Sequence, residues 1–183
     1  MPADSAARPA AARVFFALWP APELAARLAA VARERAGRGR PTRAETVHLT
    51  LAFIGDVPES RLPELVEAAG RVRAAPCALQ VDRLGHWRHN RLLWAGCSAP
   101  PPALAELVAG LLRELRAAGF AVADAERAFV PHLTLVRKLA LPPPDLGLPE
   151  TLFWECRDFV LVRSRLSAAG PDYQRLARFP LSA

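Results

Sequence analysis

The feature that most constrains this chain is a four-residue segment that occurs twice. The sequence His-Leu-Thr-Leu lies at His48–Leu51 and again at His132–Leu135, and the two copies are 84 positions apart (132 − 48 = 84). Each copy lies within an apolar, β-branched run, which is typical of a strand. Because side chains alternate between the faces of a strand, each copy presents its histidine and threonine on one face and its leucines on the other.

The order of elements around the two copies also repeats. A strand over 13–19, a helix over 21–36 and a strand over 47–54 parallel a strand over 91–97, a helix over 102–118 and a strand over 131–138. We therefore expect an α+β fold with two lobes related by a pseudo-twofold axis, in which two antiparallel sheets line a central cleft and helices pack outside. Residues 13–183 are expected to form one two-lobed domain, preceded by a flexible tail over 1–12.

Several other segments have clear local signals. A second amphipathic helix is expected from Leu62 to Val72, and further strands are expected over 78–87, 157–166 and 174–181. Residues 139–150 are rich in proline and predict a loop, and a turn is expected at 169–172.

The chain is basic, with a net charge of +6 and a sequence pI of about 10.4. Nearly all of the positive charge is arginine, whose planar fork of donors suits phosphate. Three arginines, Arg38, Arg40 and Arg43, lie in the loop over 37–46, where they could meet the phosphates of a polyanionic ligand. A solvated arginine surface without a ligand explains the charge equally well.

The cysteine spacing and the hydropathy indicate in which cellular compartment we expect the protein. Cys77, Cys97 and Cys156 are odd in number and far apart, which argues against a disulfide framework and favours buried thiols in a reducing cytosol. No apolar stretch approaches the roughly 20 residues of a membrane span. We therefore expect a cytoplasmic protein with no membrane partner.

Two histidines and two hydroxyls around one point suit phosphodiester chemistry. At neutral pH one imidazole can take a proton from water while the other gives a proton to a leaving oxygen. Threonine hydroxyls can donate hydrogen bonds to the nonbridging oxygens, where negative charge develops. No metal is required for these steps.

Other readings of the same residues remain open. The two segments are also compatible with an RNA-binding module that holds a phosphate end without turnover, or with a metal site that uses the two histidines as ligands. His86 and His89 flank an expected turn, and no carboxylate or thiol lies near them, so we interpret them as turn residues. Aromatic residues such as Phe15, Phe53 and Trp94 are interpreted mainly as core.

The paired segments resemble the His-x-Thr-x motifs of the two-histidine phosphoesterase superfamily. Their surroundings resemble the bacterial and archaeal RNA 2′,3′-cyclic phosphodiesterases, formerly called 2′-5′ RNA ligases. The matching segments are Arg13–Leu18, His48–Gly55, Arg91–Trp94, Pro131–Leu135 and Tyr173–Leu181, so the resemblance spans roughly residues 13–181.

This resemblance implies hydrolysis of an RNA terminal 2′,3′-cyclic phosphate to a 2′-phosphomonoester, without a metal or other cofactor. It implies that His48 is the proton donor and His132 the proton acceptor, and that Thr50 and Thr134 bind the phosphate. Arg137 matches an arginine that commonly follows the second motif in this family. Strict alternation would point Arg137 away from His132, so its phosphate role requires a bulge or twist. The expected partners are RNA ends, such as tRNA fragments, or small cyclic nucleotides, bound by a monomer.

Overall fold

The computed structural model describes residues 10–123, 125–167 and 170–182. The helices are α1 (Pro22–Glu34), α2 (Leu62–Gly70) and α3 (Pro102–Ala117), with short 3-10 turns η1 (Ala44–Thr46) and η2 (Glu59–Arg61). The strands are β1 (Ala11–Leu18), β2 (Arg40–Pro41), β3 (Leu49–Pro58), β4 (Cys77–Val81), β5 (Arg83–Trp87), β6 (Leu92–Gly96), β7 (Leu133–Arg137), β8 (Leu152–Cys156), β9 (Asp158–Ser167) and β10 (Gly170–Pro180).

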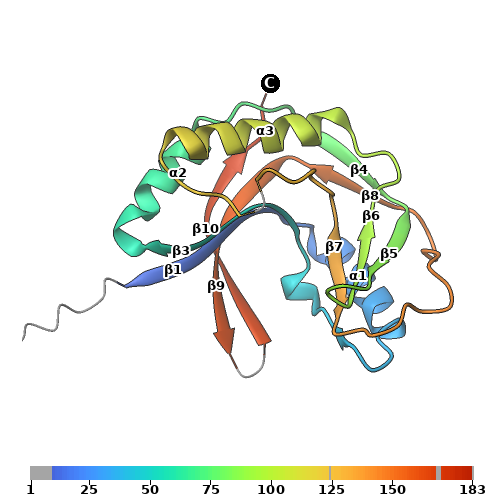
Figure 1. Ribbon diagram of the computed structural model, residues 1–183. Helices are drawn as coiled ribbons and strands as arrows, with labels where there is room; N and C mark the ends of the chain where they lie inside the picture. The colour runs from blue at the N-terminus through green and yellow to red at the C-terminus, as the bar shows by residue number, and fades with distance from the viewer. Residues whose placement is uncertain (1–9, 124, 168–169, 183) are drawn as a thin grey trace, which may run out of the picture.

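The main sheet is made of two halves that meet at one pair of residues. Its strand order is β10-β9-β1-β3-β7-β6-β5, with β2 paired to β7, and the pairs are antiparallel. The central strands β3 and β7 share a single register pair, Leu49 with Leu133. The two halves diverge from this junction (Figure 1). Each half contains one His-Leu-Thr-Leu segment, so the junction lies where the predicted twofold axis would pass.

A second sheet consists of β4 and β8, which pair antiparallel. Together with the main sheet and the helices, it confirms the predicted α+β class with two antiparallel sheets. Strand β8 was not predicted, although Leu152, Trp154 and Cys156 are buried at alternate positions, as in a half-buried strand. Residues 78–87, expected as one strand, form two: β4 lies in the small sheet and β5 in the main sheet.

The helices follow their predicted apolar stripes closely. Helix α1 buries Leu24, Leu28 and Val31, and α3 buries a stripe that begins at Leu104 and ends at Leu115. Pro63 lies in the first turn of α2, where its missing N–H costs no hydrogen bond.

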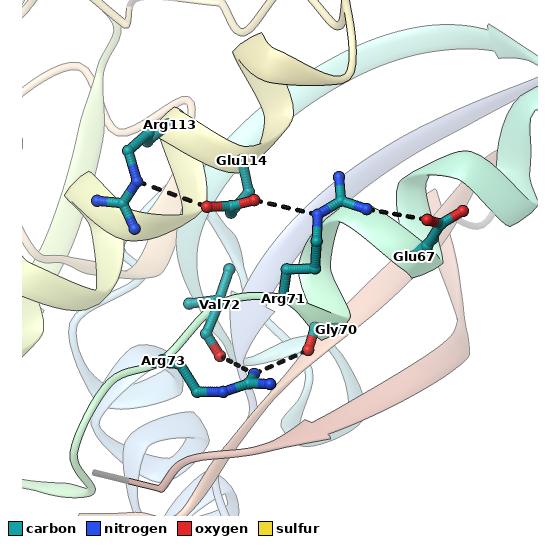
Figure 2. A network of polar contacts seen from close by, with 7 residues as sticks. All are labelled: Glu67, Gly70, Arg71, Val72, Arg73, Arg113 and Glu114. Carbon is teal, nitrogen blue, oxygen red and sulfur yellow. Dashed lines mark hydrogen bonds and ion pairs between the residues drawn. The ribbon is translucent and has the colours of Figure 1, made fainter.

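Surface arginines connect the end of α2 to α3. Arg71 lies between Glu67 of α2 and Glu114 of α3, with nitrogen–oxygen distances of 3.0 Å and 3.2 Å (Figure 2). Arg113 approaches the same Glu114 carboxylate at 3.5 Å, and Arg73 donates to the carbonyl oxygens of Gly70 and Val72. Exposed ion pairs contribute at most about 1 kcal/mol each, so this network adds little to the stability of the fold.

A single cluster of buried apolar side chains continues from one half of the sheet to the other. It includes Phe16 and Leu51 from the first half, Leu93 and Leu135 from the second half, and Leu111 from α3. This continuity supports treating residues 13–183 as one folded unit, which remains a prediction.

Several predicted boundaries differ from the observed ones. Residues 1–9 of the expected tail over 1–12 lie outside the described residues, and β1 already begins at Ala11, where it pairs with Pro58 of β3. Strand β3 continues past the expected stop at Gly55, which adopts a φ of 84° within the strand. Part of the turn expected at 169–172 is strand, because β10 begins at Gly170; residue 169 lies outside the described residues.

None of the helices in the described part of the chain is long and apolar enough to cross a membrane.

Candidate active site

His48 and His132 lie beside each other at the junction of the two half-sheets. Each histidine immediately precedes the leucine that forms the Leu49–Leu133 pair, so the main-chain pairing of β3 with β7 brings the two imidazoles together. Both side chains line one cleft of about 590 Å³. The same cleft is lined by the other three predicted site residues, Thr50, Thr134 and Arg137.

The two imidazoles are held by equivalent hydrogen bonds. Nδ1 of His48 donates to the carbonyl oxygen of Thr46 at 2.7 Å, and Nδ1 of His132 donates to the carbonyl oxygen of Val130 at 2.9 Å. A carbonyl oxygen can only accept, so the hydrogen must be on Nδ1 in both rings. Nε2 is therefore the nitrogen of each ring that remains available to exchange protons with a ligand.

The predicted alternation of faces is observed in both segments. Leu49, Leu51, Leu133 and Leu135 are buried in the core, whereas the threonines between them are half-buried and line the cleft. This places one hydroxyl next to each imidazole.

A β-bulge at Leu135 turns Arg137 toward the cleft. In the pairing of β6 with β7, Leu93 lies opposite Val136 and Trp94 lies opposite Thr134, so Leu135 has no partner of its own. Leu135 and Val136 are therefore both buried, and Arg137 returns to the face that carries Thr134. This is the irregularity that a phosphate role for Arg137 requires.

The first half of the sheet has the same bulge, at Leu51. In the pairing of β1 with β3, Phe16 lies opposite Ala52 and Ala17 lies opposite Thr50, and both Leu51 and Ala52 are buried. The residue that then returns to the cleft is Phe53, which occupies the position equivalent to Arg137, five residues after the histidine.

Aromatic rings surround His48 more completely than His132. The Trp19 ring stacks on the His48 ring with a centroid distance of 5.4 Å and an angle of 9°, while Phe15 and Tyr173 pack at 4.9 Å and 5.2 Å. Among the described residues, His132 has one such neighbour, Trp87, at 4.6 Å. Sequence reasoning did not identify Trp19, Tyr173 or Trp87 as site residues, because no local pattern links them to the motifs.

The environment favours neutral imidazoles in the free protein. Burial is the main cause that lowers the pKa of His48 to about 4, and the positive charges of Arg137 and His132 lower it further against the opposing hydrogen bond to Thr46. Burial and then Arg137 also lower the pKa of His132, against its hydrogen bond to Val130. Arg137 therefore acts electrostatically on both rings.

The cleft has a second, basic opening next to the histidines, with a volume of about 450 Å³. It shares His48, Thr134 and Arg137 with the first opening. Its other cationic residues are Arg40, Arg43 and Lys138, so two of the three arginines of the loop over 37–46 lie at the site. Arg38 instead lines a separate hollow beside Leu139 and Pro142.

Of the other histidines, His89 lines the same cleft as the predicted site residues, next to Trp87, whereas His86 and the three cysteines do not line it. His86 donates through Nε2 to the carbonyl oxygen of Leu139 at 2.8 Å, which fits a structural role. The three cysteines are buried free thiols, as predicted, and Cys77 pairs with Cys156 across β4 and β8. Within the described residues, no three His, Cys, Asp or Glu side chains are grouped so as to hold a metal ion.

Comparisons with known proteins agree on the family. The model of the LigT like phosphoesterase family matches residues 18–94, which include the first motif. The RNA 2′,3′-cyclic phosphodiesterase of Escherichia coli (strain K12) is 34% identical over 148 residues, covering 79% of this chain and 81% of that enzyme. The RNA 2′,3′-cyclic phosphodiesterase of Thermus thermophilus is 33% identical over 181 residues, covering 92% of this chain and 90% of the enzyme.

Solved structures give the same result for the fold. The E. coli LigT structure in complex with 3′-AMP superimposes with a TM-score of 0.85 at 28% identity, covering 95% of this chain and 100% of LigT. A Thermus thermophilus structure, TT0787, gives a TM-score of 0.78 at 28% identity, with 92% and 97% coverage. The predicted resemblance is confirmed, and this chain belongs to the LigT like phosphoesterase family, together with relatives named RNA 2′,3′-cyclic phosphodiesterase.

Proposed function

We propose that this chain is an RNA 2′,3′-cyclic phosphodiesterase that opens a terminal cyclic phosphate to a 2′-phosphomonoester by paired-histidine catalysis. The observation that carries the proposal is the matched state of the two imidazoles. Each is locked through Nδ1 to the carbonyl two residues earlier, and both Nε2 atoms are left free beside one cleft. The names of the relatives support the substrate class.

The reaction needs one proton acceptor and one proton donor on opposite sides of phosphorus. Nε2 of His132 takes a proton from water as the water oxygen forms a bond to phosphorus. The bond between phosphorus and the 3′ oxygen breaks, and Nε2 of His48 gives its proton to that oxygen. The products are a 2′-phosphomonoester and a free 3′ hydroxyl, and each proton transfer is typically worth about 10²–10⁴-fold in rate.

The remaining site residues stabilise the charge on phosphorus. Thr50 and Thr134 can donate hydrogen bonds to the nonbridging oxygens, and Arg137 offers a guanidinium that holds phosphate with two parallel donors. Positive charge that already lies beside the phosphate before reaction costs no reorganisation in the transition state.

The assignment of donor and acceptor depends on the bound phosphate. In the free protein the lowered pKa of His48 disfavours the imidazolium that a donor requires. A bound phosphate anion offsets the charge of Arg137 and favours the protonated ring, because an opposite charge nearby stabilises the charged form. We therefore assign His48 as donor and His132 as acceptor.

The donor set also supports a reaction without a metal. Two imidazoles and two hydroxyls surround the site, and the guanidinium of Arg137 acts on both imidazoles. A divalent cation placed among these groups would be repelled by Arg137, and Arg137 supplies the positive charge that such a cation would otherwise provide.

The proposal is tested by incubating the protein with adenosine 2′,3′-cyclic phosphate in excess EDTA. We expect full turnover with the phosphate found only on the 2′ oxygen. A 3′-phosphate product would contradict the assigned bond cleavage, and loss of turnover in EDTA would show a metal requirement. Binding of the nucleotide with no turnover in either condition would favour the alternative, a module that only holds RNA ends.

A further inference from the structure

The basic opening beside the histidines carries more positive charge than the reaction at one phosphate needs. Arg40, Arg43 and Lys138 line it together with Arg137, and none of its lining residues in the described part of the chain is Asp or Glu. None of these four side chains has a carboxylate partner within the described residues, whereas arginines elsewhere on the surface, such as Arg27 and Arg35, form ion pairs. Four unpaired cations around one hollow favour an anionic ligand.

The backbone brings two of these cations together at a cost. Strand β2 pairs with the end of β7 so that Arg40 lies directly opposite Arg137. Like charges at directly opposite positions of an antiparallel pair are destabilising. The next residue, Lys138, has a backbone φ of 58°, a conformation that residues other than glycine and asparagine rarely adopt. An anion between these residues would offset the repulsion.

Arg43 also lines the opening. Its Nη2 donates to the carbonyl oxygen of Pro171 at the start of β10, at 3.1 Å, and this links the loop over 37–46 to the β9–β10 hairpin. Its remaining donors have no carboxylate partner in the described residues, so they are available to a ligand.

We infer that the basic opening is a second phosphate subsite, formed by Arg40, Arg43 and Lys138, that binds the phosphate on the 5′ side of the terminal nucleoside. The inference rests on the proposed function. If the cyclic phosphate lies between His48 and His132, the next anionic group of an RNA chain is the 5′ phosphate of the same nucleoside. The shared residues His48, Thr134 and Arg137 make the basic opening continuous with the reacting site, so one nucleotide can extend from one to the other.

This subsite would distinguish an RNA end from a free cyclic nucleoside. A nucleoside 2′,3′-cyclic phosphate with a 5′ hydroxyl leaves Arg40 and Arg43 without a ligand. The same nucleoside with a 5′ phosphate, or a dinucleotide with a cyclic end, engages them. The substrate class favoured by the site is therefore a 5′-phosphorylated or oligomeric RNA end.

The experiment compares kcat/KM for adenosine 2′,3′-cyclic phosphate, its 5′-phosphorylated form, and a dinucleotide with the same cyclic end. We expect the wild-type protein to prefer the last two by about tenfold or more at low salt, with the preference shrinking as salt rises. The double variant Arg40→Ala, Arg43→Ala should reduce the preference to within about twofold, because the 5′ phosphate loses its two guanidinium partners while the 5′-hydroxyl substrate has no such contact to lose. Both side chains are exposed, so their removal leaves the core intact.

Arg38→Ala is the matched control. It removes one positive charge from the same loop, where the double variant removes two, and Arg38 lines a different hollow. It should keep the wild-type preference. The inference is overturned if wild type shows no preference, if the double variant keeps it, or if Arg38→Ala abolishes it to the same extent. If the wild-type protein hydrolyses none of the three substrates, the proposed function itself is contradicted. That result differs from equal rates on all three, which contradicts only the second subsite.

Discussion

The two halves of the sheet provide the same scaffold and different chemical environments. Both present a histidine whose Nδ1 donates to the carbonyl two residues earlier, a threonine two residues later, and a bulge that returns the fifth residue to the cleft. That fifth residue is Phe53 in one half and Arg137 in the other. Three aromatic rings pack around His48 and one around His132. The repeated backbone thus places the two imidazoles at one cleft, while the neighbouring side chains give each imidazole a different environment.

The largest expected effect comes from removing one imidazole at a time. His48→Ala and His132→Ala should each lower kcat on a cyclic phosphate by about 10²–10⁴-fold, because each removes one proton transfer. A substrate with a good leaving group needs no proton donor. On an aryl phosphodiester, His48→Ala should therefore regain most of its loss while His132→Ala does not.

This comparison tests the assignment of roles directly. Recovery of His132→Ala alone would reverse donor and acceptor. If both variants lose the same factor in kcat on both substrates, the two histidines cannot be assigned separate roles as donor and acceptor. Thermal unfolding of both variants, measured in parallel, checks that each remains folded.

A second effect should separate the two fifth residues, Phe53 and Arg137. Arg137→Gln removes charge next to phosphorus and should lower kcat by about 10²-fold, in the range found when one donor to a developing oxyanion is lost. Phe53→Ala removes apolar surface from the cleft wall and should raise KM about tenfold with little change in kcat, in line with the typical strength of base stacking on an aromatic ring. Steady-state kinetics on one cyclic nucleotide measures both. The same pattern in both variants would contradict different roles.

The smallest effect concerns stability against pH. The pKa of His48 is about 4 in the folded protein and near 6.5 when unfolded, so between these values the unfolded chain holds a proton that the folded chain lacks. The free energy of unfolding should therefore fall as pH drops from about 6.5 to about 4, with a contribution from His48 of at most about 1.4 kcal/mol per pH unit.

His48→Asn should flatten this dependence, and His132→Asn should flatten it less, because fewer rings enclose His132. Denaturant unfolding at several pH values between 7 and 4 measures the three slopes. Carboxylates contribute equally to all three proteins and cancel in the difference. Identical slopes for wild type and His48→Asn would contradict the buried, neutral state of this ring.

Local patterns predicted most of the elements and the two histidines that the structure places at one cleft. The sequence shows the helices over Leu24–Val31 and Leu104–Leu115 and the alternation in the two His-Leu-Thr-Leu segments. These patterns are visible because the apolar residues on the buried face of a helix or strand recur at a regular spacing. Strand β8 was missed because the proline-rich loop before it hid a short alternation. The bulge at Leu135 was not visible, because two adjacent buried residues look like an ordinary apolar strand.

The sequence by itself determined the class of fold, the two imidazole–hydroxyl pairs and the family, since these depend on residue type and short spacing. Only the tertiary structure decided that Arg137 points into the cleft, that Arg40 and Arg43 line it while Arg38 does not, and that Trp19 and Tyr173 enclose His48. These features depend on which strands pair and in what register. Pairing between residues that are far apart in the chain leaves no signal in the neighbours of any one of them.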